Sequence, residues 1–288
     1  MSEKVALARQ ALRAALQLRR SLSIARESPV NAFDVAQMIG IDVRFLDAPS
    51  LEGMFVRDPG PRILLPSSAH RPKARIAFSC AHEIGHQQFD HGTRADHYLD
   101  LGPEHDAFVP DEYLADAFAG HLLMPRAAVM GAFDRRNWNA EAPTPLQVFV
   151  VACELGVGYE TLILHLHIVL EVLTAKMRGT LLGSTPKSIK SELIGKIWAG
   201  PLTVIDDAWK HAFIDLEVGE ILALPTAPDS KCELLELNSN NGGRVSFTAL
   251  KSGVAEFTAG MSRKTLRVSR QHYVGPYSNR YLTDPDEH

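Results

Sequence analysis

This 288-residue sequence has few cysteines, no large excess of one charge and no long apolar run near its start. Its three cysteines, Cys80, Cys153 and Cys232, lie far apart, form no Cys-x-x-Cys pair and leave an odd number. This pattern argues against a disulfide framework and favours a reducing compartment. We therefore expect a cytoplasmic protein.

The formal net charge is only −4 at pH 7. A chain with so small a net charge has no strong electrostatic attraction to nucleic acid or to an anionic membrane. We expect no membrane partner and no direct binding to DNA. Nothing in the sequence fixes the oligomeric state.

The N-terminal segment is rich in alanine and is interrupted by arginines, so it lacks the apolar stretch of a signal peptide or a membrane span. Its apolar residues recur at helical spacing, which predicts an amphipathic helix packed on the following domain. The members of that stripe are Val5, Ala8, Leu12 and Leu16.

The most specific pattern is the pentapeptide His82-Glu83-Ile84-Gly85-His86. Four residues of an α-helix turn through about 400°, so His82 and His86 leave one face and can reach the same ion. Zinc accepts imidazole nitrogen and carboxylate oxygen, and a catalytic site uses three protein ligands with the fourth position open. The pattern predicts one Zn²⁺ per chain, with Glu83 as the general base.

The third ligand must come from elsewhere in the chain. His91 follows His82 by nine residues, and on a continuing helix nine residues turn through about 900°, which would place it on the opposite face. Glu112 is the better candidate, because on a second predicted helix it shares a face with Asp116, and the small Ala115 allows close helix approach. We expect Asp116 to hold the other ring N–H of His82, which would fix the tautomer of that ligand.

The His-Glu-x-x-His pattern is typical of zinc peptidases, and in such an enzyme we expect a further side chain to donate to the developing oxyanion. The candidates are Tyr113, Tyr98, His97 and His105, and the last three lie in a polar segment, 92–110, that we expect to be a loop. His121 is a weaker candidate, because nine residues from Glu112 turn it to the far side of the same helix.

Two sequence blocks carry a family resemblance. Residues 81–86 read AHEIGH, and residues 112–125 read EYLADAFAGHLLMP. Together with a short predicted helix after Pro29 that ends at Gly40, they resemble the ImmA/IrrE family of metallo-endopeptidases, a branch of the gluzincins, over residues 1–135. That family often has Asn where Asp116 stands, and either side chain can accept a histidine N–H.

The resemblance implies a zinc-dependent endopeptidase that hydrolyses a peptide bond in a protein substrate. The implied substrate is a DNA-binding helix-turn-helix repressor that acts in a stress-response or mobile-element pathway. The resemblance also implies a sheet above the helix that carries His82 and His86.

An α+β fold is expected. Residues 1–135 predict a zincin-like catalytic domain with strands at 41–46, 51–56 and 63–65 and a long helix from Pro72. We expect Arg62–Pro66 to be an edge strand, available to pair with an extended peptide.

Residues 136–178 predict two helices around Gly156, an arrangement similar to a helix-turn-helix. Its acidic residues, including Glu154 and Glu160, and its scarcity of Lys and Arg favour a packing role over contact with DNA phosphates. Residues 179–200 predict a linker and a short helix. Alternating apolar segments in 201–288 predict a β-sandwich-like domain that regulates the enzyme or recruits its substrate.

A second hypothesis remains open. The chain could be a transcription regulator or a partner-binding protein that uses the helix-turn-helix-like segment and carries a latent or structural zinc site. The intact Glu83, the candidate general base, argues against it. The number of ligands also argues against it, because a structural zinc site fills all four positions with protein ligands, whereas this sequence offers three.

Overall fold

The computed structural model describes residues 3–92, 94–97, 108–227, 232–241, 244–259 and 262–282. Internal contacts divide the chain into two compact units. The first unit is Met1–Val129 with Val274–Tyr277, and the second is Met130–Tyr273 with Ser278–His288. The mixed α+β architecture confirms the expected fold class. The predicted domains follow one another along the chain. The observed units do not, because residues 274–277 return to the first unit.

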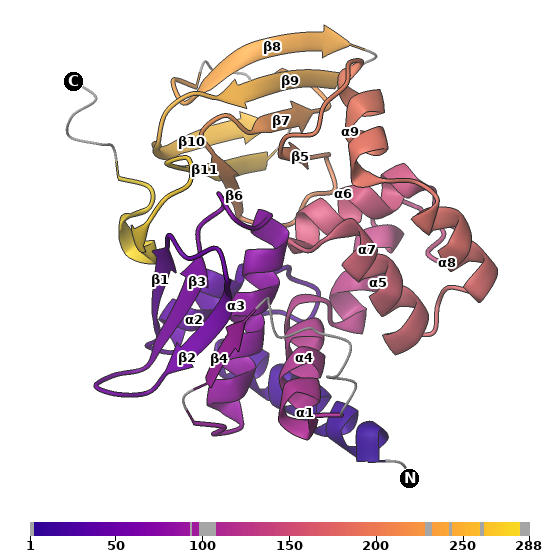
Figure 1. Ribbon diagram of the computed structural model, residues 1–288. Helices are drawn as coiled ribbons and strands as arrows, with labels where there is room; N and C mark the ends of the chain where they lie inside the picture. Colours follow the sequence, from indigo (N-terminus) through magenta and orange to yellow (C-terminus); the bar gives the residue numbers. More distant parts are fainter. Residues whose placement is uncertain are drawn as a thin grey trace. The chain divides into compact units, whose positions relative to one another are not determined.

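The first unit contains one mixed sheet with helices packed around it (Figure 1). Its helices are α1 (Glu3–Ser21), α2 (Ala32–Met38), α3 (Lys73–Gln88) and α4 (Pro110–Leu123). Its strands are β1 (Asp42–Leu46), β2 (Leu51–Val56), β3 (Arg62–Pro66), β4 (Arg94–His97) and β12 (Gly275–Pro276). Helix α3 packs on β2 and β3 and against α4, which also contacts α1.

The strand order of this sheet is β12-β1-β3-β2-β4. Strands β1 and β3 are parallel, and the other neighbours are antiparallel. The prediction that Arg62–Pro66 is an edge strand is therefore wrong, because β1 pairs with one side of β3 and β2 with the other. Within the described residues the outer strands are β4 and β12. Strand β4 also shows that segment 92–110 is not a loop throughout.

The predicted apolar stripe of α1 is wrong. Three of its members are exposed by 37–42%: Val5, Leu12 and Leu16. The buried face consists instead of Ala11, Ala15, Leu18 and Arg19. Small alanines allow α1 to approach α4 closely, and Arg19 donates to the carbonyl oxygen of Leu122 at 2.9 Å. Close packing and this hydrogen bond, rather than hydrophobicity alone, select the buried face.

The second unit begins with most of α5 (Arg126–Asp134), which crosses the boundary between the units. Helices α6 (Pro145–Leu155), α7 (Tyr159–Leu164), η2 (His165–Val169), α8 (Ala175–Leu182) and α9 (Pro186–Ile194) follow. A capping box at Thr144 begins α6, and Gly156, with φ of 67°, ends it. The predicted linker does not begin at residue 179, because the last turn of α8 covers residues 179–182.

Helices α6 and α7 meet at a bend of 103°, an angle typical of a helix-turn-helix. The sequence predicts the second helix from Tyr159 to about Val172, but α7 ends at Leu164 and the chain continues as the π-helix η2 only to Val169. Among the described residues no single helix is long and apolar enough to cross a membrane, and only the bent pair α6 and α7–η2 reaches that length and hydropathy together.

Two small sheets complete the second unit. One has the order β10-β11-β6 and the other β5-β7-β9-β8. Their strands are β5 (Leu202–Val204), β6 (Phe213–Glu217), β7 (Ile221–Leu224), β8 (Leu235–Asn241), β9 (Arg244–Ala249), β10 (Gly253–Ala259) and β11 (Ser262–Ser269). The 3₁₀-helix η3 (Tyr277–Asn279) lies near the C-terminus.

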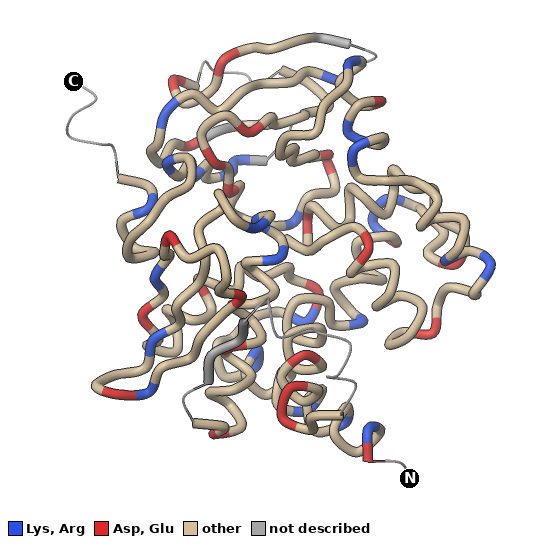
Figure 2. The backbone as a smooth tube through the Cα atoms, in the orientation of Figure 1, with Lys and Arg blue, Asp and Glu red and all other residues tan. Residues whose placement is uncertain are grey.

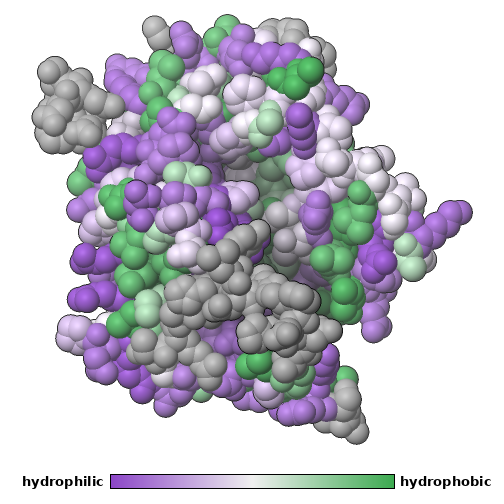
Figure 3. All heavy atoms as spheres, in the orientation of Figure 1, coloured by the Kyte–Doolittle hydropathy of each residue, from purple (hydrophilic) through white to green (hydrophobic). Residues whose placement is uncertain are grey.

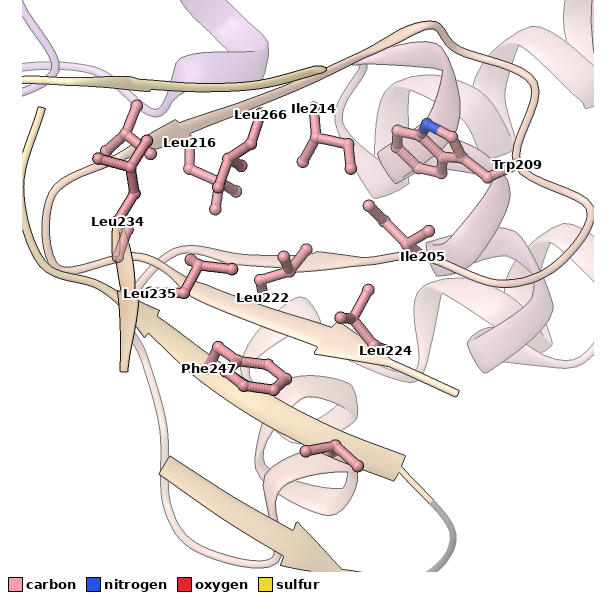
Figure 4. Packing of buried hydrophobic residues seen from close by; sticks show 13 residues of the cluster. Ile205, Trp209, Ile214, Leu216, Leu222, Leu224, Leu234, Leu235, Phe247 and Leu266 are labelled. Atoms are coloured by element: carbon pink, nitrogen blue, oxygen red, sulfur yellow. The ribbon is translucent and has the colours of Figure 1, made fainter. Parts of the chain in front are cut away.

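A shared apolar core lies between these two sheets (Figure 4). Leu216 and Leu266 come from one sheet, Leu222 and Phe247 from the other, and Trp209 closes one end. Packing of this kind, with apolar faces turned inward, is that of a β-sandwich. The predicted sandwich-like C-terminal region is confirmed.

Candidate metal centre

Helices α3 and α4 approach each other at two small residues. A Cβ atom at Gly85 would lie 3.0 Å from the Cα of Ala115 and 3.2 Å from its carbonyl oxygen. Gly85 precedes His86, and Ala115 lies between Glu112 and Asp116. Because the two backbones touch at this point, the polar side chains of both helices project into the same space.

Three side chains converge there: His82 and His86 from α3, and Glu112 from α4. The Nε2 atoms of the two histidines are 2.9 Å apart. Glu112 Oε2 lies 3.2 Å from Nε2 of His82 and 3.5 Å from Nε2 of His86. The potential ligand atoms of these residues all lie within 4.8 Å of one another, an arrangement that could hold a metal ion.

This donor set fits the metal that the sequence predicts. Two imidazole nitrogens and one carboxylate oxygen are ligands that zinc accepts, and three protein ligands leave a position open. His82 and His86 are buried, and Glu112 is partly exposed. Hydrogen bonds from the two histidines hold the pKa of Glu112 well below its ordinary value, so this carboxyl is ionised, as a ligand must be.

Asp116 contacts the ring of His82. Its Oδ1 is 2.8 Å from Nδ1 of His82, the ring nitrogen on the opposite side from the converging Nε2 atoms. If the Nδ1 of His82 carries the proton and donates to Asp116, the Nε2 lone pair is free for a metal.

Glu83 is 1% exposed and lies beneath strand β2. A Cβ atom at Gly53 in β2 would overlap Glu83 Oε1, so any larger residue at that position would displace the carboxylate. Gly53 is a residue that sequence reasoning missed. A glycine inside an apolar strand was the available signal, because such glycines often mark a close approach of another group.

His91 and Asp111 were also missed as partners of the site. Nδ1 of His91 is 2.8 Å from Nδ1 of His86, and Nε2 of His91 is 3.6 Å from Asp111 Oδ1. The prediction that His91 lies on the opposite face of a continuing helix is wrong, because α3 ends at Gln88. His91 nevertheless faces the Nδ1 side of His86, not the converging Nε2 atoms.

The predicted oxyanion donors are not brought to the site by any described contact. The ring of Tyr113 lies 5.6 Å from that of Phe108. His97 ends β4, but its side chain lies outside the described part of the chain, as do Tyr98 and His105. The donor stays a prediction.

Two further titratable groups lie on the same helices. Cys80 is fully buried, and burial, followed by the charges of Glu83 and Asp34, raises the pKa of its thiol well above the ordinary value. A thiol in that state is a poor metal ligand. His121 is in the last turn of α4, and burial lowers its pKa.

Comparison with known proteins agrees with the geometry. Residues 36–167 match the family model of the IrrE N-terminal-like domain, a peptidase family. A search of curated proteins gives no match. The matched segment contains both helices of the candidate metal centre and extends to the pair α6 and α7. The match assigns an IrrE N-terminal-like domain to residues 36–167, in agreement with the resemblance of the sequence to the ImmA/IrrE family of metallopeptidases.

Proposed function

We propose that this protein is a cytoplasmic zinc-dependent endopeptidase. The observation that supports this most strongly is the convergence of His82, His86 and Glu112, with Glu83 one residue along the same helix. Three atoms that carry lone pairs lie close together in a largely buried place, and a cation between them offsets their mutual repulsion.

The chemistry divides among the residues as follows. Bound zinc would supply Lewis acidity to the scissile carbonyl and to the attacking water. His82, His86 and Glu112 hold the ion, and Asp116 fixes the tautomer of His82. Glu83 takes the proton of the attacking water and passes it to the leaving amine. Gly53 leaves room for the Glu83 carboxylate beneath β2.

We propose a protein substrate, and specifically a DNA-binding helix-turn-helix repressor in a stress-response or mobile-element pathway, as the family resemblance implies. The second unit would recruit that substrate or regulate the enzyme. Along the backbone of each unit, acidic residues are interspersed among basic ones (Figure 2). This distribution favours a protein partner over nucleic acid.

The segment Tyr159–Val169, where a helix-turn-helix would read bases, contains no Lys or Arg. It exposes Leu164, Ile168 and Val169 by 42–64%, and apolar side chains show on that part of the surface in Figure 3. Phosphate contacts need cationic side chains, so this surface is poorly suited to DNA.

The test is cleavage of candidate repressors encoded in the same genome, followed by mass spectrometry of the fragments. The zinc-loaded protein should cut one of them. Glu83→Gln should retain metal but lose about 10²- to 10⁴-fold in turnover, because it removes the general base. If the loaded protein leaves every candidate intact under inducing conditions, the proposed substrate class is wrong.

The angle between α6 and α7 is the one observation that favours a transcription regulator instead. Binding to a defined DNA duplex, weakened by salt and unchanged in Glu83→Gln, would support that alternative. We expect no such binding, because the exposed face of these helices lacks cations.

A further inference from the structure

After the end of helix α3 the chain reverses direction, and His91 comes to lie beside His86. Phe89 is the C-cap residue of α3, and Asp90 follows it with φ of 60°, in the left-handed region. The N–H of Asp90 donates to the carbonyl of Gln87 at 3.3 Å, and the N–H of His91 donates to the carbonyl of His86 at 3.0 Å. These two bonds form a Schellman motif, which places His91 beside the second histidine of the pentapeptide.

The ring of His91 is held on more than one side. It stacks on Phe89 with a centroid distance of 5.7 Å and an interplanar angle of 27°. Phe89 in turn packs edge-on against the buried Phe118 of α4 at 5.9 Å. The His91 side chain is 8% exposed. A histidine so enclosed keeps one orientation, and in that orientation its Nδ1 faces Nδ1 of His86.

The direction of the hydrogen bond between the two rings follows from the metal site. If Nε2 of His86 gives its lone pair to a cation, Nδ1 of His86 must carry the proton and donate. Nδ1 of His91 then accepts, and the proton of His91 lies on Nε2. That Nε2–H faces Asp111 Oδ1 at 3.6 Å, a distance at which the carboxylate acts through its charge rather than by a short hydrogen bond.

We propose that His91 is a positioning residue for the metal ligand His86 and that Asp111 fixes the tautomer of His91. The two histidine ligands are then supported unequally. His82 donates directly to the carboxylate of Asp116 at 2.8 Å, whereas His86 donates to a neutral imidazole with a carboxylate behind it. This inference rests on the proposed metal site and assigns two further residues, His91 and Asp111, that orient its ligand His86.

The test uses the full chain and measures Zn²⁺ affinity by competition with a chromophoric chelator. His91→Phe keeps an aromatic ring beside Phe89 but removes the acceptor, and it should weaken zinc binding about 10- to 100-fold. His91→Asn places an amide oxygen near the former Nδ1, and it should bind zinc within about threefold of wild type. Asp111→Asn should show a smaller loss than His91→Phe, because its contact is longer.

A second readout separates positioning from packing. With Co²⁺ in place of zinc, the visible ligand-field spectrum should shift in His91→Phe and return towards wild type in His91→Asn. Equal affinity and an unchanged spectrum in His91→Phe would overturn the inference, as would His91→Asn binding as weakly as His91→Phe. If His91→Phe does not fold without metal, Asp111→Asn decides alone, and wild-type affinity there would also overturn it. Absence of zinc binding by wild type would instead defeat the proposed function.

Discussion

Both units bury charged and polar side chains, but they arrange them differently. In the second unit Glu154, 1% exposed, accepts from Arg135 at 2.9 Å, from Arg136 at 2.8 Å and from the backbone N–H of Lys210 at 2.8 Å. In the first unit the Nε2 atoms of two buried histidines and a carboxylate oxygen face one another. Oppositely charged groups that pair with each other need no ligand, and breaking such a buried pair destabilises the fold, whereas lone pairs that converge form a site for a cation.

Asp215 is a second carboxylate of the second unit that is paired with an arginine. Burial alone would raise the pKa of this carboxyl, but hydrogen bonds and charge from Arg267, with Arg280 and Tyr281, hold it below its ordinary value. Arg267 contacts both oxygens of Asp215 at 2.7 Å. This pair is complete without a ligand, so we assign it to the stability of the second unit and not to chemistry.

The largest effect on the second unit should come from Arg136→Ala. It leaves Glu154 and Asp206 without a cation that contacts both, and breaking a buried pair of this kind costs about 3–5 kcal/mol in the free energy of unfolding. Chemical denaturation measures the loss, and zinc affinity of the folded variant should be unchanged. The exposed Lys187→Ala is the control, expected within about 0.5 kcal/mol of wild type. Comparable losses in the two variants would contradict the assigned role.

Metal removal should act on the first unit. At free zinc about a hundredfold above the dissociation constant, binding stabilises the folded state by about 2.7 kcal/mol. Hydrogen exchange followed by mass spectrometry should show faster exchange in peptides of α3 and α4 after chelation and no change in β6 and β9. Equal changes in both units would show that the metal is not confined to the first.

Gly53→Ala should have a smaller effect that is specific to catalysis. The new Cβ would displace Glu83, so turnover should fall roughly ten- to a hundredfold while zinc content is retained. Gly60→Ala is the matched control, because a Cβ there has no neighbour within 4 Å. Full activity in Gly53→Ala would show that the position of Glu83 beneath β2 is unimportant.

The smallest effect should be a change in how stability depends on pH. Asp215→Asn should remove the pH-dependent part of the stability that this carboxyl contributes. A carboxyl whose pKa is lowered by folding contributes stability above its unfolded pKa of about 3.9, and this contribution disappears as the pH falls through the folded pKa. The difference in denaturation midpoint between wild type and Asp215→Asn should therefore narrow below about pH 4. The exposed Asp207→Asn is the control, with a stability expected within about 0.5 kcal/mol of wild type. A gap that widens on acidification would reverse the assigned sign.

The sequence alone predicted the helical faces and strands that follow from the local spacing of residues. His82 and His86 are one turn apart, and Glu112 and Asp116 repeat that spacing, so both helical faces could be predicted. The strand at 51–56 was visible as an apolar segment between turns, and the strands of the second unit were visible as alternating apolar segments in 201–288. These features depend on neighbours within a few residues.

The features that sequence reasoning missed depend on distant or terminal contacts. The interior position of β3 follows from pairing with β1 and β2, and the return of β12 to the first sheet joins segments more than 200 residues apart. His91 was misplaced because the end of α3 depends on the left-handed Asp90, which a helical projection ignores.

The most direct test of the central claim is the zinc content of protein purified without chelators, measured by inductively coupled plasma mass spectrometry. Wild type should carry about one zinc per chain, and Glu112→Ala should carry far less, because removing one of three protein ligands opens the site. The exposed Glu160→Ala should match wild type. No zinc in wild type, or equal zinc in wild type and Glu112→Ala, would contradict the account.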